Sequence, residues 1–378
     1  MAYVFYLPTR VVFGVGAIQE LGKEAKGLGK KALIITYPDI RRIGLLDKVM
    51  ADLKANGVDS VVFDKVEPNP RSATIDEGAK LARDQKIDLV IGLGGGSAMD
   101  AAKGVALASS GTESIWQYIV ARLQPKGPVP SIIQVPTMAG TGAEMNYGAV
   151  ITNWATHEKM VAVHPAAMAK VTIIDPAITL TVPKNQTAAG GVDTFCHIVE
   201  AYITDTQPAP LTDGIRETVM KMVVYYLPKV LVKLDDIDAR TQLSWASTIA
   251  MSQFARLGGG LGNLALHGIE HALSGYYDVT HGAGLAALLP TWMRFMLPTA
   301  KERVSLLGKN VFGKTDGIQV TEEWLKQVGM RLRLRDLGCQ LEQADEIARL
   351  VLSSYPPGSP QLRLLDAAAI AQMYRDAF

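Results

Sequence analysis

Short apolar runs alternate with amphipathic stretches through the first half of the chain, and this rhythm constrains the fold more strongly than any other feature. Two of the amphipathic stretches, LLDKVMADLKANG (45–57) and TIDEGAKLARDQ (74–85), have helical spacing. Strand, helix and strand in this order predict βαβ units and a mainly parallel sheet, and continuous apolar strands fit a sheet covered on both faces. The candidate strands are KALIIT (31–36), SVVFDKV (60–66), DLVIGLG (88–94), SIIQVPT (131–137), AVIT (149–152) and KVTIID (170–175).

The pattern changes near Pro183, after which strand signals are almost absent and long helical periodicity takes over. A chain of 378 residues is long enough for two domains. We therefore predict an α/β domain over residues 1–184 and an all-α domain over residues 185–378. Within the second domain, the glycine-rich stretch LGGGLGN (257–263) predicts a turn or a break between helices.

Charge and composition exclude several classes of partner. The net charge is +1 at pH 7, which gives no electrostatic footprint for nucleic acid or for an anionic membrane. No apolar run reaches the roughly 18–20 residues that a membrane span requires, and no signal peptide is evident at the N-terminus. The two cysteines, Cys196 and Cys339, form no disulfide framework and fit a reducing compartment. We expect a soluble cytoplasmic protein.

A glycine run in the first half, IGLGGGSAMDAAK (91–103), follows an apolar strand and opens a helical pattern. Glycines let the backbone approach an anion, and the free N–H groups of a helix start attract phosphate. The run lacks the GxxxxGK[ST] motif and also fails GxGxxG, because Ser97 stands at the third glycine position. A similar turn, PTMAGTGAEMN (136–146), follows another strand. Each turn alone could be purely structural, but together they favour a dinucleotide.

Histidines gather in the second half, where three of the six lie within the fifteen residues HGIEHALSGYYDVTH (267–281). His267 and His271 are four residues apart, as are Asp193 and His197, so each pair shares one helix face. A lone buried histidine is more often a hydrogen-bonded core residue than a ligand. Several imidazoles and one carboxylate in otherwise apolar segments instead favour a site for a divalent ion such as Fe²⁺ or Zn²⁺.

Over nearly its whole length the chain resembles the iron-containing, or group III, alcohol dehydrogenases. The segment TGAEMNYGAVITN is most similar to the butanol dehydrogenase and aldehyde reductase branch. The resemblance implies a dehydroquinate-synthase-like fold, with an α/β nucleotide-binding domain and a helical domain. It also implies a homodimer that transfers hydride between a small primary alcohol or diol and a nicotinamide coenzyme. The motifs that carry the resemblance are PTRVVFGVGAI, GGGSAMDAAK, PTMAGTGAEMNYGAVITN, GVDTFCHIVEAY and HGIEHALSGYYDVTHG.

The resemblance also implies roles for individual residues. The family's metal ligands match Asp193, His197, His267 and His281, and His271 matches a position facing the substrate, where it could relay the alcohol proton. The expected metal is Fe²⁺, with Zn²⁺ or another divalent ion as the alternative. The positions that match coenzyme contacts are Gly95, Gly96 and Ser97 for the pyrophosphate, Thr137 and Thr141 for the nicotinamide side, Lys159 for its ribose, and Asn69 for the adenosine end.

The choice between NAD and NADP rests on the segment after the first predicted strand. NAD-using members of the family commonly have an aspartate there that bonds the ribose hydroxyls. This chain has Tyr37 at that position and Asp39 two residues later, and Asp39 is the candidate for this coenzyme contact. Arg41 and Arg42 could meet a 2′-phosphate, whereas Asp39 would repel one. Both coenzymes stay open, with NADP(H) slightly favoured.

Other functions fit the same pattern less well. A glycerol-dehydrogenase-like polyol oxidation usually uses three metal ligands, whereas four are available here. A dehydroquinate-synthase-like lyase would need basic residues for a phosphorylated, carboxylated substrate, and no Lys or Arg stands between His267 and His281. A nucleotide-binding protein without chemistry would not need the complete ligand set. We therefore expect a metal-dependent, NAD(P)-linked alcohol dehydrogenase or aldehyde reductase.

Overall fold

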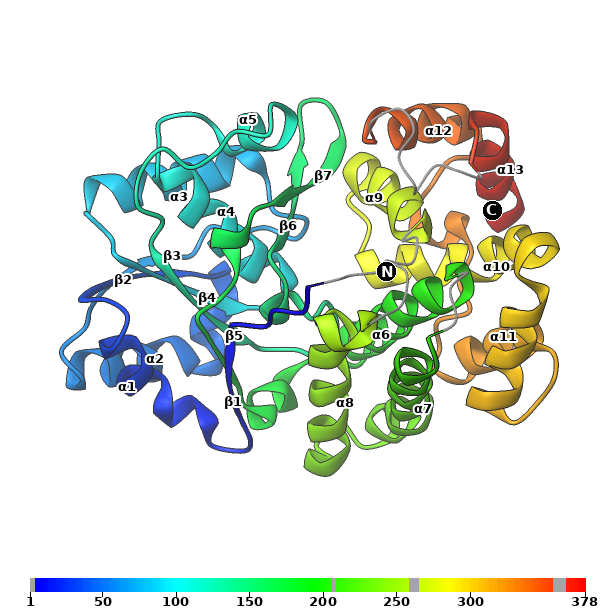
Figure 1. Cartoon of the computed structure of the whole chain (residues 1–378), viewed down its shortest axis with the longest axis horizontal. Helices are drawn as coiled ribbons and strands as arrows, with labels where there is room; N and C mark the ends of the chain where they lie inside the picture. Colours follow the sequence, from blue (N-terminus) through cyan, green and yellow to red (C-terminus); the bar gives the residue numbers. More distant parts are fainter. Residues whose placement is uncertain (1–3, 206–208, 258–264, 356–364) are drawn as a thin grey trace. The chain divides into compact units, whose positions relative to one another are not determined.

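The computed structural model describes residues 4–205, 209–257, 265–355 and 365–378, so the predicted turn LGGGLGN lies outside the described residues except for Leu257. The chain divides into two compact units (Figure 1). The α/β unit comprises Leu7–Thr156 and Met160–Val182. The helical unit comprises Pro183–Phe378 together with His157–Lys159 and the first residues of the chain.

The α/β unit is built on a six-stranded parallel sheet with the strand order β1-β8-β5-β4-β2-β3. The chain runs from β2 outward to β3 and then returns to the other side of β2 as β4, so its direction of winding reverses between β2 and β4. In open parallel sheets, ligands bind at such a reversal, beyond the carboxyl ends of the strands. The strands are β1 (Arg10–Phe13), β2 (Lys31–Ile35), β3 (Asp59–Phe63), β4 (Leu89–Gly94), β5 (Ser131–Pro136) and β8 (Val171–Ile174).

Helices cover both faces of this sheet, as the apolar strands predict (Figure 1). Neighbouring residues of one strand point to opposite faces. Leu33 accordingly packs in the core beneath α3, α4 and α5, whereas Ile34 packs in the core beneath α1 and α2. The helices are α1 (Leu21–Lys26), α2 (Leu45–Ala55), α3 (Ser72–Asp84), α4 (Gly96–Ser109) and α5 (Ile115–Val120).

One predicted strand lies outside the parallel sheet. AVIT (149–152) falls within β6 (Gly148–Asn153), which pairs with β7 (Glu158–Val163) in a separate two-stranded sheet. A connection of only a few residues joins β6 to β7, and such a short connection favours a hairpin over a parallel crossover. The sequence pattern also missed β1 and β7. β1 has only four residues, which are exposed or half-buried at the sheet edge, and so it lacks the buried apolar run of the inner strands.

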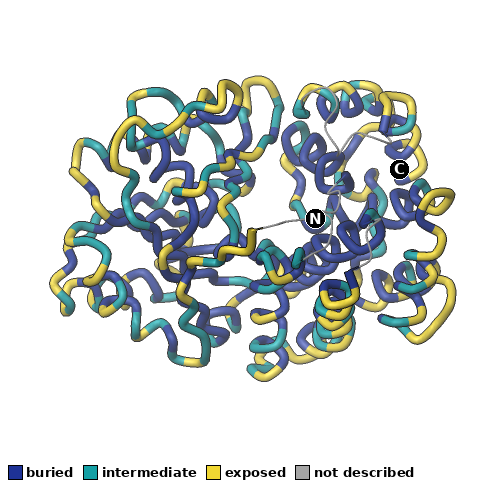
Figure 2. The backbone as a smooth tube through the Cα atoms, viewed as in Figure 1, coloured by how far each residue is buried: buried dark blue, intermediate teal, exposed yellow. Residues whose placement is uncertain are grey.

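The helical unit is arranged around α6 (Lys184–Thr204), which packs against α7 and α10. Every residue of α6 from Thr187 to Ile203 is buried (Figure 2). Polar side chains on α6 therefore face protein on all sides and need partners there. The other helices are α7 (Pro210–Val232), α8 (Ile237–Ala250), α9 (Ala265–Tyr277), α10 (His281–Leu307), α11 (Gly317–Gln327), α12 (Ala344–Ser353) and α13 (Ala367–Ala377).

Three of these helices have the length of a membrane span, with 21 residues in α6, 23 in α7 and 27 in α10. Length alone does not place a helix in a bilayer, because a span must also be apolar and nearly free of charge. Within the described part of the chain, no helix meets both conditions.

Candidate active site

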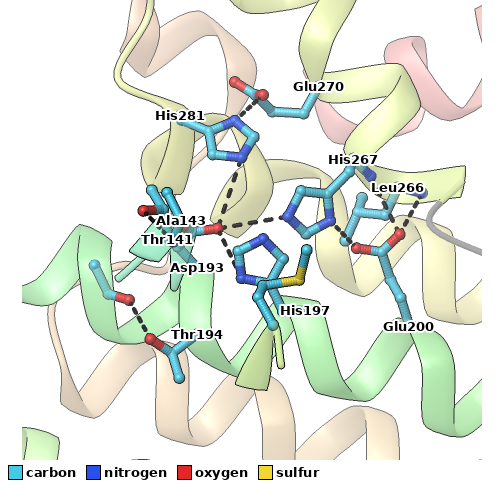
Figure 3. Close-up of polar contacts among 12 residues, drawn as sticks. Thr141, Ala143, Asp193, Thr194, His197, Glu200, Leu266, His267, Glu270 and His281 are labelled. Atoms are coloured by element: carbon cyan, nitrogen blue, oxygen red, sulfur yellow. Dashed lines mark hydrogen bonds and ion pairs between the residues drawn. The ribbon is translucent and has the colours of Figure 1, made fainter. Parts of the chain in front are cut away.

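The carboxylate of Asp193 lies at the centre of three imidazoles (Figure 3). Its Oδ1 atom lies 3.6 Å from Nδ1 of His197, 3.4 Å from Nε2 of His267 and 3.6 Å from Nε2 of His281. Asp193 and His197 stand one turn apart on α6, His267 belongs to α9, and His281 is the first residue of α10. The helical unit thus brings together all four residues that the sequence analysis matched to metal ligands.

These donor atoms fit a divalent cation. Asp193 Oδ1, His197 Nδ1 and His267 Nε2 are buried without a hydrogen-bond partner, although buried polar atoms normally have one. A tetrahedral ion with bonds of about 2.1 Å would separate its ligand atoms by about 3.4 Å. The distances of 3.4–3.6 Å from Asp193 Oδ1 therefore match the edges of such a coordination shell. One carboxylate and three imidazoles suit Fe²⁺ or Zn²⁺.

A second carboxylate, that of Glu200, fixes the orientation of His267. Glu200 lies two turns beyond Asp193 on α6, is fully buried, and contacts Nδ1 of His267 with its Oε1 atom. Its Oε2 atom accepts the backbone N–H groups of Leu266 at 2.8 Å and His267 at 3.2 Å. Because Nδ1 faces Glu200, the other ring nitrogen of His267 faces Asp193.

Glu270 orients His281 in the same way. It is fully buried on α9, one turn after His267, and its Oε2 atom contacts Nδ1 of His281. Its Oε1 atom accepts the hydroxyl hydrogen of Ser274. Neither glutamate was predicted as a site residue from the sequence. The available signal was their spacing, because Glu200 and Glu270 each follow a candidate ligand by three residues in an apolar stretch.

Charge balance also calls for a cation. Asp193, Glu200 and Glu270 place three carboxylates in the interior of the helical unit, where unpaired charges are costly. Lys159 is also buried, and the pKa of Glu270 is lowered, against the effect of burial, first by His281 and then by the positive charge of Lys159. If the imidazoles are neutral, the three carboxylates are balanced by one lysine and one divalent cation.

The pKa values of the imidazoles follow from the same contacts. Burial lowers the pKa of His197 to about 3. Burial acts in the same direction on His267, but the carboxylates of Glu200 and Asp193 raise its pKa to about 10. The pKa of Asp193 is lowered, because its neighbouring imidazoles outweigh the effect of burial. The two carboxylates around His267 therefore attract a proton strongly, and a metal ion must displace that proton from Nε2.

His271 lies beside this cluster without entering the Asp193 set. Its ring centre lies 5.5 Å from that of His281 and 6.4 Å from that of His267. Burial, and after it the positive charge of Lys159, lowers the pKa of His271 well below its ordinary value. His271 is therefore a neutral imidazole at physiological pH, able to accept or donate a proton through its two ring nitrogens.

The glycine run forms a turn at the reversal point of the sheet. β4 ends at Gly94, Gly95 precedes the first turn of α4, and Gly96 and Ser97 begin that turn. A Cβ atom on Gly96 would lie 2.4 Å from Cγ2 of Thr141, which leaves no room for a side chain. The lack of a side chain on Gly96 thus lets the two turns pack closely at the start of α4, where the sequence predicts a phosphate.

The second turn packs against the first. The backbone N–H of Thr137 donates to the carbonyl of Gly94 at 2.9 Å, and Thr141 contacts Gly96 as described above. Asn69, in the loop after β3, is buried and has a left-handed backbone with φ of 53°. Lys159 lies in β7 and belongs by its contacts to the helical unit.

The segment after β2 presents paired charges. Asp39 forms an ion pair with Arg42 at 3.2 Å, and Arg41 forms one with Asp47 at 2.9 Å. Tyr37 occupies the position at which NAD-using family members commonly have an aspartate, and its ring lies against Gly94. A Cβ atom there would stand 3.3 Å from the ring of Tyr37. Both arginines considered for a 2′-phosphate thus already contact carboxylates.

Comparisons with known proteins cover both units. A family model described as iron-containing alcohol dehydrogenase matches residues 8–176, and one described as Fe-containing alcohol dehydrogenase family, C-terminal, matches residues 187–378. NADH-dependent butanol dehydrogenase B of Clostridium acetobutylicum is 37% identical over 387 residues, covering 99% of this chain and 98% of that protein. The 1,3-propanediol dehydrogenase of Citrobacter freundii is 31% identical, covering 99% and 98%.

A solved structure from the same family also matches the fold. The crystal structure of NADH-dependent butanol dehydrogenase A from Thermotoga maritima matches with a TM-score of 0.95 at 34% identity, covering 100% of this chain and 98% of that one. A match of this extent includes the parallel sheet and the helical unit together. The predicted fold class, an α/β nucleotide-binding part followed by a helical part in a dehydroquinate-synthase-like arrangement, is confirmed.

Proposed function

The chain belongs to the iron-containing alcohol dehydrogenase family, and on that premise we propose that it interconverts small primary alcohols or diols and their aldehydes with a nicotinamide coenzyme. The observation that carries the proposal is the convergence of three imidazole nitrogens within 3.4–3.6 Å of Asp193 Oδ1. Relatives named for butanol and for 1,3-propanediol support a substrate with a terminal hydroxyl group.

Asp193, His197, His267 and His281 are the proposed metal ligands, with Fe²⁺ as the expected ion and Zn²⁺ as the alternative. A bound divalent cation supplies a Lewis acid that stabilises negative charge on the substrate oxygen. The protein's own contribution is orientation. Contacts to two buried carboxylates turn the Nε2 atoms of His267 and His281 toward Asp193.

Coenzyme binding is assigned to the α/β unit. The backbone of Gly95, Gly96 and Ser97 would bind the pyrophosphate at the start of α4, because helix N–H groups there have no partner within the helix. When bound, the coenzyme would supply the hydride acceptor for the alcohol or the hydride donor for the aldehyde. The remaining assignments rest on family resemblance: Thr137 and Thr141 on the nicotinamide side, Lys159 at its ribose and Asn69 near the adenosine.

His271 is the proposed proton relay. A neutral imidazole close to His281 can accept the proton that leaves an alcohol and pass it on from its other nitrogen. Lys159 acts on this step, because its positive charge helps to keep the pKa of His271 low and thus favours return of the proton to the next acceptor.

NAD(H) is the proposed coenzyme, in place of the NADP(H) that the sequence slightly favoured. Several relatives are named as NADH-dependent or as probable NADH-dependent enzymes, including the two butanol dehydrogenases already described. Arg42 pairs with Asp39 and Arg41 with Asp47, so a 2′-phosphate would have to compete with a carboxylate for each guanidinium.

A homodimer in the cytoplasm completes the proposal. The dimer follows from family resemblance, and sedimentation of the purified protein measures it directly. The location is supported by the two cysteines, Cys196 and Cys339, which are both buried free thiols and so fit a reducing compartment.

Reconstitution of metal-free protein tests the function. We expect protein loaded with Fe²⁺ or Zn²⁺ to produce NADH from 1-butanol and 1,3-propanediol, followed by absorbance of the reduced coenzyme, and to consume it with butanal. Glycerol serves as the comparison substrate for the polyol alternative, and faster turnover of glycerol would favour that alternative. Absence of net coenzyme turnover with every metal and every substrate would contradict the proposal.

A further inference from the structure

Lys103 is a buried ammonium group to which the proposed function assigns no role. It ends the glycine-rich segment GGGSAMDAAK on α4, and its side chain is fully buried. Burial of a charge is costly unless hydrogen bonds and opposite charges compensate it. Its Nζ atom donates to the carbonyl of Gly148 at 2.6 Å, to Oδ1 of Asn146 at 3.0 Å and to Oδ1 of Asp100 at 3.4 Å. Its three hydrogens thus have three acceptors.

Two of these acceptors belong to the segment that follows Thr141. Asn146 extends this hydrogen-bond network, because its Nδ2 atom donates to the carbonyl of Gly142 at 3.2 Å. Its Oδ1 atom, besides meeting Lys103, accepts the backbone N–H of Gly148 at 3.0 Å. Lys103 is therefore linked through one side chain to Gly142, the residue next to Thr141.

Acidic groups complete the network. Asp100, one turn before Lys103 on α4, accepts the backbone N–H of Val150 in β6 with its Oδ2 atom at 2.9 Å. Glu144 is buried nearby. Burial lowers the pKa of Lys103, and the carboxylates of Asp100 and Glu144 oppose that shift. The segment between Thr141 and β6 is thus fastened to α4 at its β6 end, and Asn146 links that end back to Gly142.

We propose that Lys103 is a positioning residue for the coenzyme, because it fastens the turn that carries Thr141 to the helix whose first turn carries Gly95 and Gly96. The two turns already touch at the bond from Thr137 N–H to the Gly94 carbonyl, and Lys103 holds the opposite end of the second turn. The inference rests on the proposed function, since it concerns the pyrophosphate and nicotinamide ends of one dinucleotide.

A role in packing alone would not require a charge. Methionine has a similar length, fills irregular core space and carries no desolvation cost. The ammonium is justified by the three directed bonds that it forms with Asp100, Asn146 and Gly148, and these bonds specify one conformation of the segment. Without them the segment must be ordered when the coenzyme binds, and the conformational entropy lost then weakens binding.

The test measures binding of NADH to the purified protein, by protein fluorescence or calorimetry in the absence of substrate. We expect Lys103→Met to raise the Kd for NADH about tenfold or more, which corresponds to about 1.4 kcal/mol. The KM for coenzyme should rise with it, while metal content and the KM for butanol stay unchanged. Asn146→Ala removes the link to Gly142 together with the bonds that its Oδ1 atom accepts from Lys103 and Gly148, but leaves the bonds of Lys103 to Asp100 and Gly148. It should raise the Kd in the same direction by a smaller factor.

The matched control is Val105→Ala, which removes core packing from the same helix. Val105 is fully buried on α4 and lies against Gly78, outside the Lys103 network. The Val105→Ala substitution should lower the Tm without changing the Kd for NADH. If Lys103→Met does not fold, Asn146→Ala decides the question alone.

Three outcomes would overturn the inference. The first is an unchanged Kd in folded Lys103→Met, and the second is an unchanged Kd in Asn146→Ala. The third is a rise in the Kd of Val105→Ala that is as large, relative to its loss of stability, as the rise in the Kd of Lys103→Met. If the unaltered protein binds neither NADH nor NADPH, the proposed function fails as well. Normal binding by the unaltered protein together with unchanged variants overturns only the role of Lys103.

Discussion

The carboxylate of Glu200 holds His267 twice, through Nδ1 of the imidazole and through the backbone N–H. The second contact lies at the start of α9, whose first N–H groups have no partner within the helix. One side chain on α6 thus sets both the beginning of α9 and the direction of the ring that α9 presents. Since α6 also carries Asp193, the two faces of the candidate metal centre are fixed relative to each other.

Glu200→Gln should weaken metal binding while the fold is retained. The amide keeps the shape of the side chain but removes the negative charge that attracts the N–H of His267. Loss of such a supporting carboxylate typically costs about 10- to 100-fold in metal affinity. Metal retained after dialysis against a competing chelator measures the effect. Glu346→Gln, which changes a carboxylate paired with Arg349 on the surface, is the control and should retain metal normally. Equal retention by both variants would contradict the prediction.

Part of the candidate metal centre could be predicted from spacing, and the rest could not. Asp193 with His197, and His267 with His271, stand four residues apart, so each pair had to share a helix face. Nothing in the spacing brings α6 beside α9, or selects His281 over His271 as the neighbour of Asp193. Those choices depend on tertiary packing, and in the sequence they came only from family resemblance.

The supporting residues show the same limit. Glutamate in a helix is usually solvent-exposed, so the spacing of Glu200 and Glu270 behind candidate ligands was a weak signal until α6 and α9 were seen to be buried. AVIT (149–152) was correctly predicted as part of a strand, but an apolar run does not reveal which strand it pairs with. Lys103 gave no signal either, because a lysine at the end of a helical motif is ordinarily a surface residue.

His267→Ala and His271→Ala should separate metal binding from proton transfer. His267 lies 3.4 Å from Asp193 Oδ1, so its loss should leave the protein unable to retain metal. His271 lies outside that set, so its variant should keep the metal and lose turnover by about 100-fold or more, as expected for an acid–base group. Metal analysis beside the pH profile of kcat checks both. Full metal content in His267→Ala, or unchanged turnover in His271→Ala, would refute the corresponding assignment.

Metal-free protein should lose stability as the pH rises through the range in which His267 titrates. Glu200 and Asp193, acting against burial, raise the pKa of His267 from 6.5 to about 10. Because the folded pKa is the higher one, the protonated ring stabilises the fold. That contribution is complete below about pH 6.5 and is lost as the pH rises toward 10. In metal-loaded protein the cation takes the place of this proton, so its stability should not fall in this way.

Urea unfolding of both forms at several pH values from about 6 to about 10 measures this difference. The interval between the unfolding midpoints of loaded and metal-free protein should widen as the pH rises. His267→Gln, which has no titrating ring, provides the control, and its metal-free form should lack the decline. Parallel curves for the two forms of the unaltered protein would show that His267 does not carry the proton.

Gly96→Ala should weaken coenzyme binding through a steric contact. The added Cβ would lie 2.4 Å from Cγ2 and 2.8 Å from Oγ1 of Thr141, so the two turns must move apart. Overpacking of this kind typically costs about 1–3 kcal/mol, and we expect a loss of NADH affinity of about tenfold or more with metal content unchanged. Gly214→Ala in α7 is the matched control, since no atom lies within 4 Å of the added Cβ and alanine favours a helix by about 0.5–1 kcal/mol. It should bind NADH normally and unfold at a slightly higher temperature. Normal NADH affinity in Gly96→Ala would place the pyrophosphate elsewhere than at the start of α4.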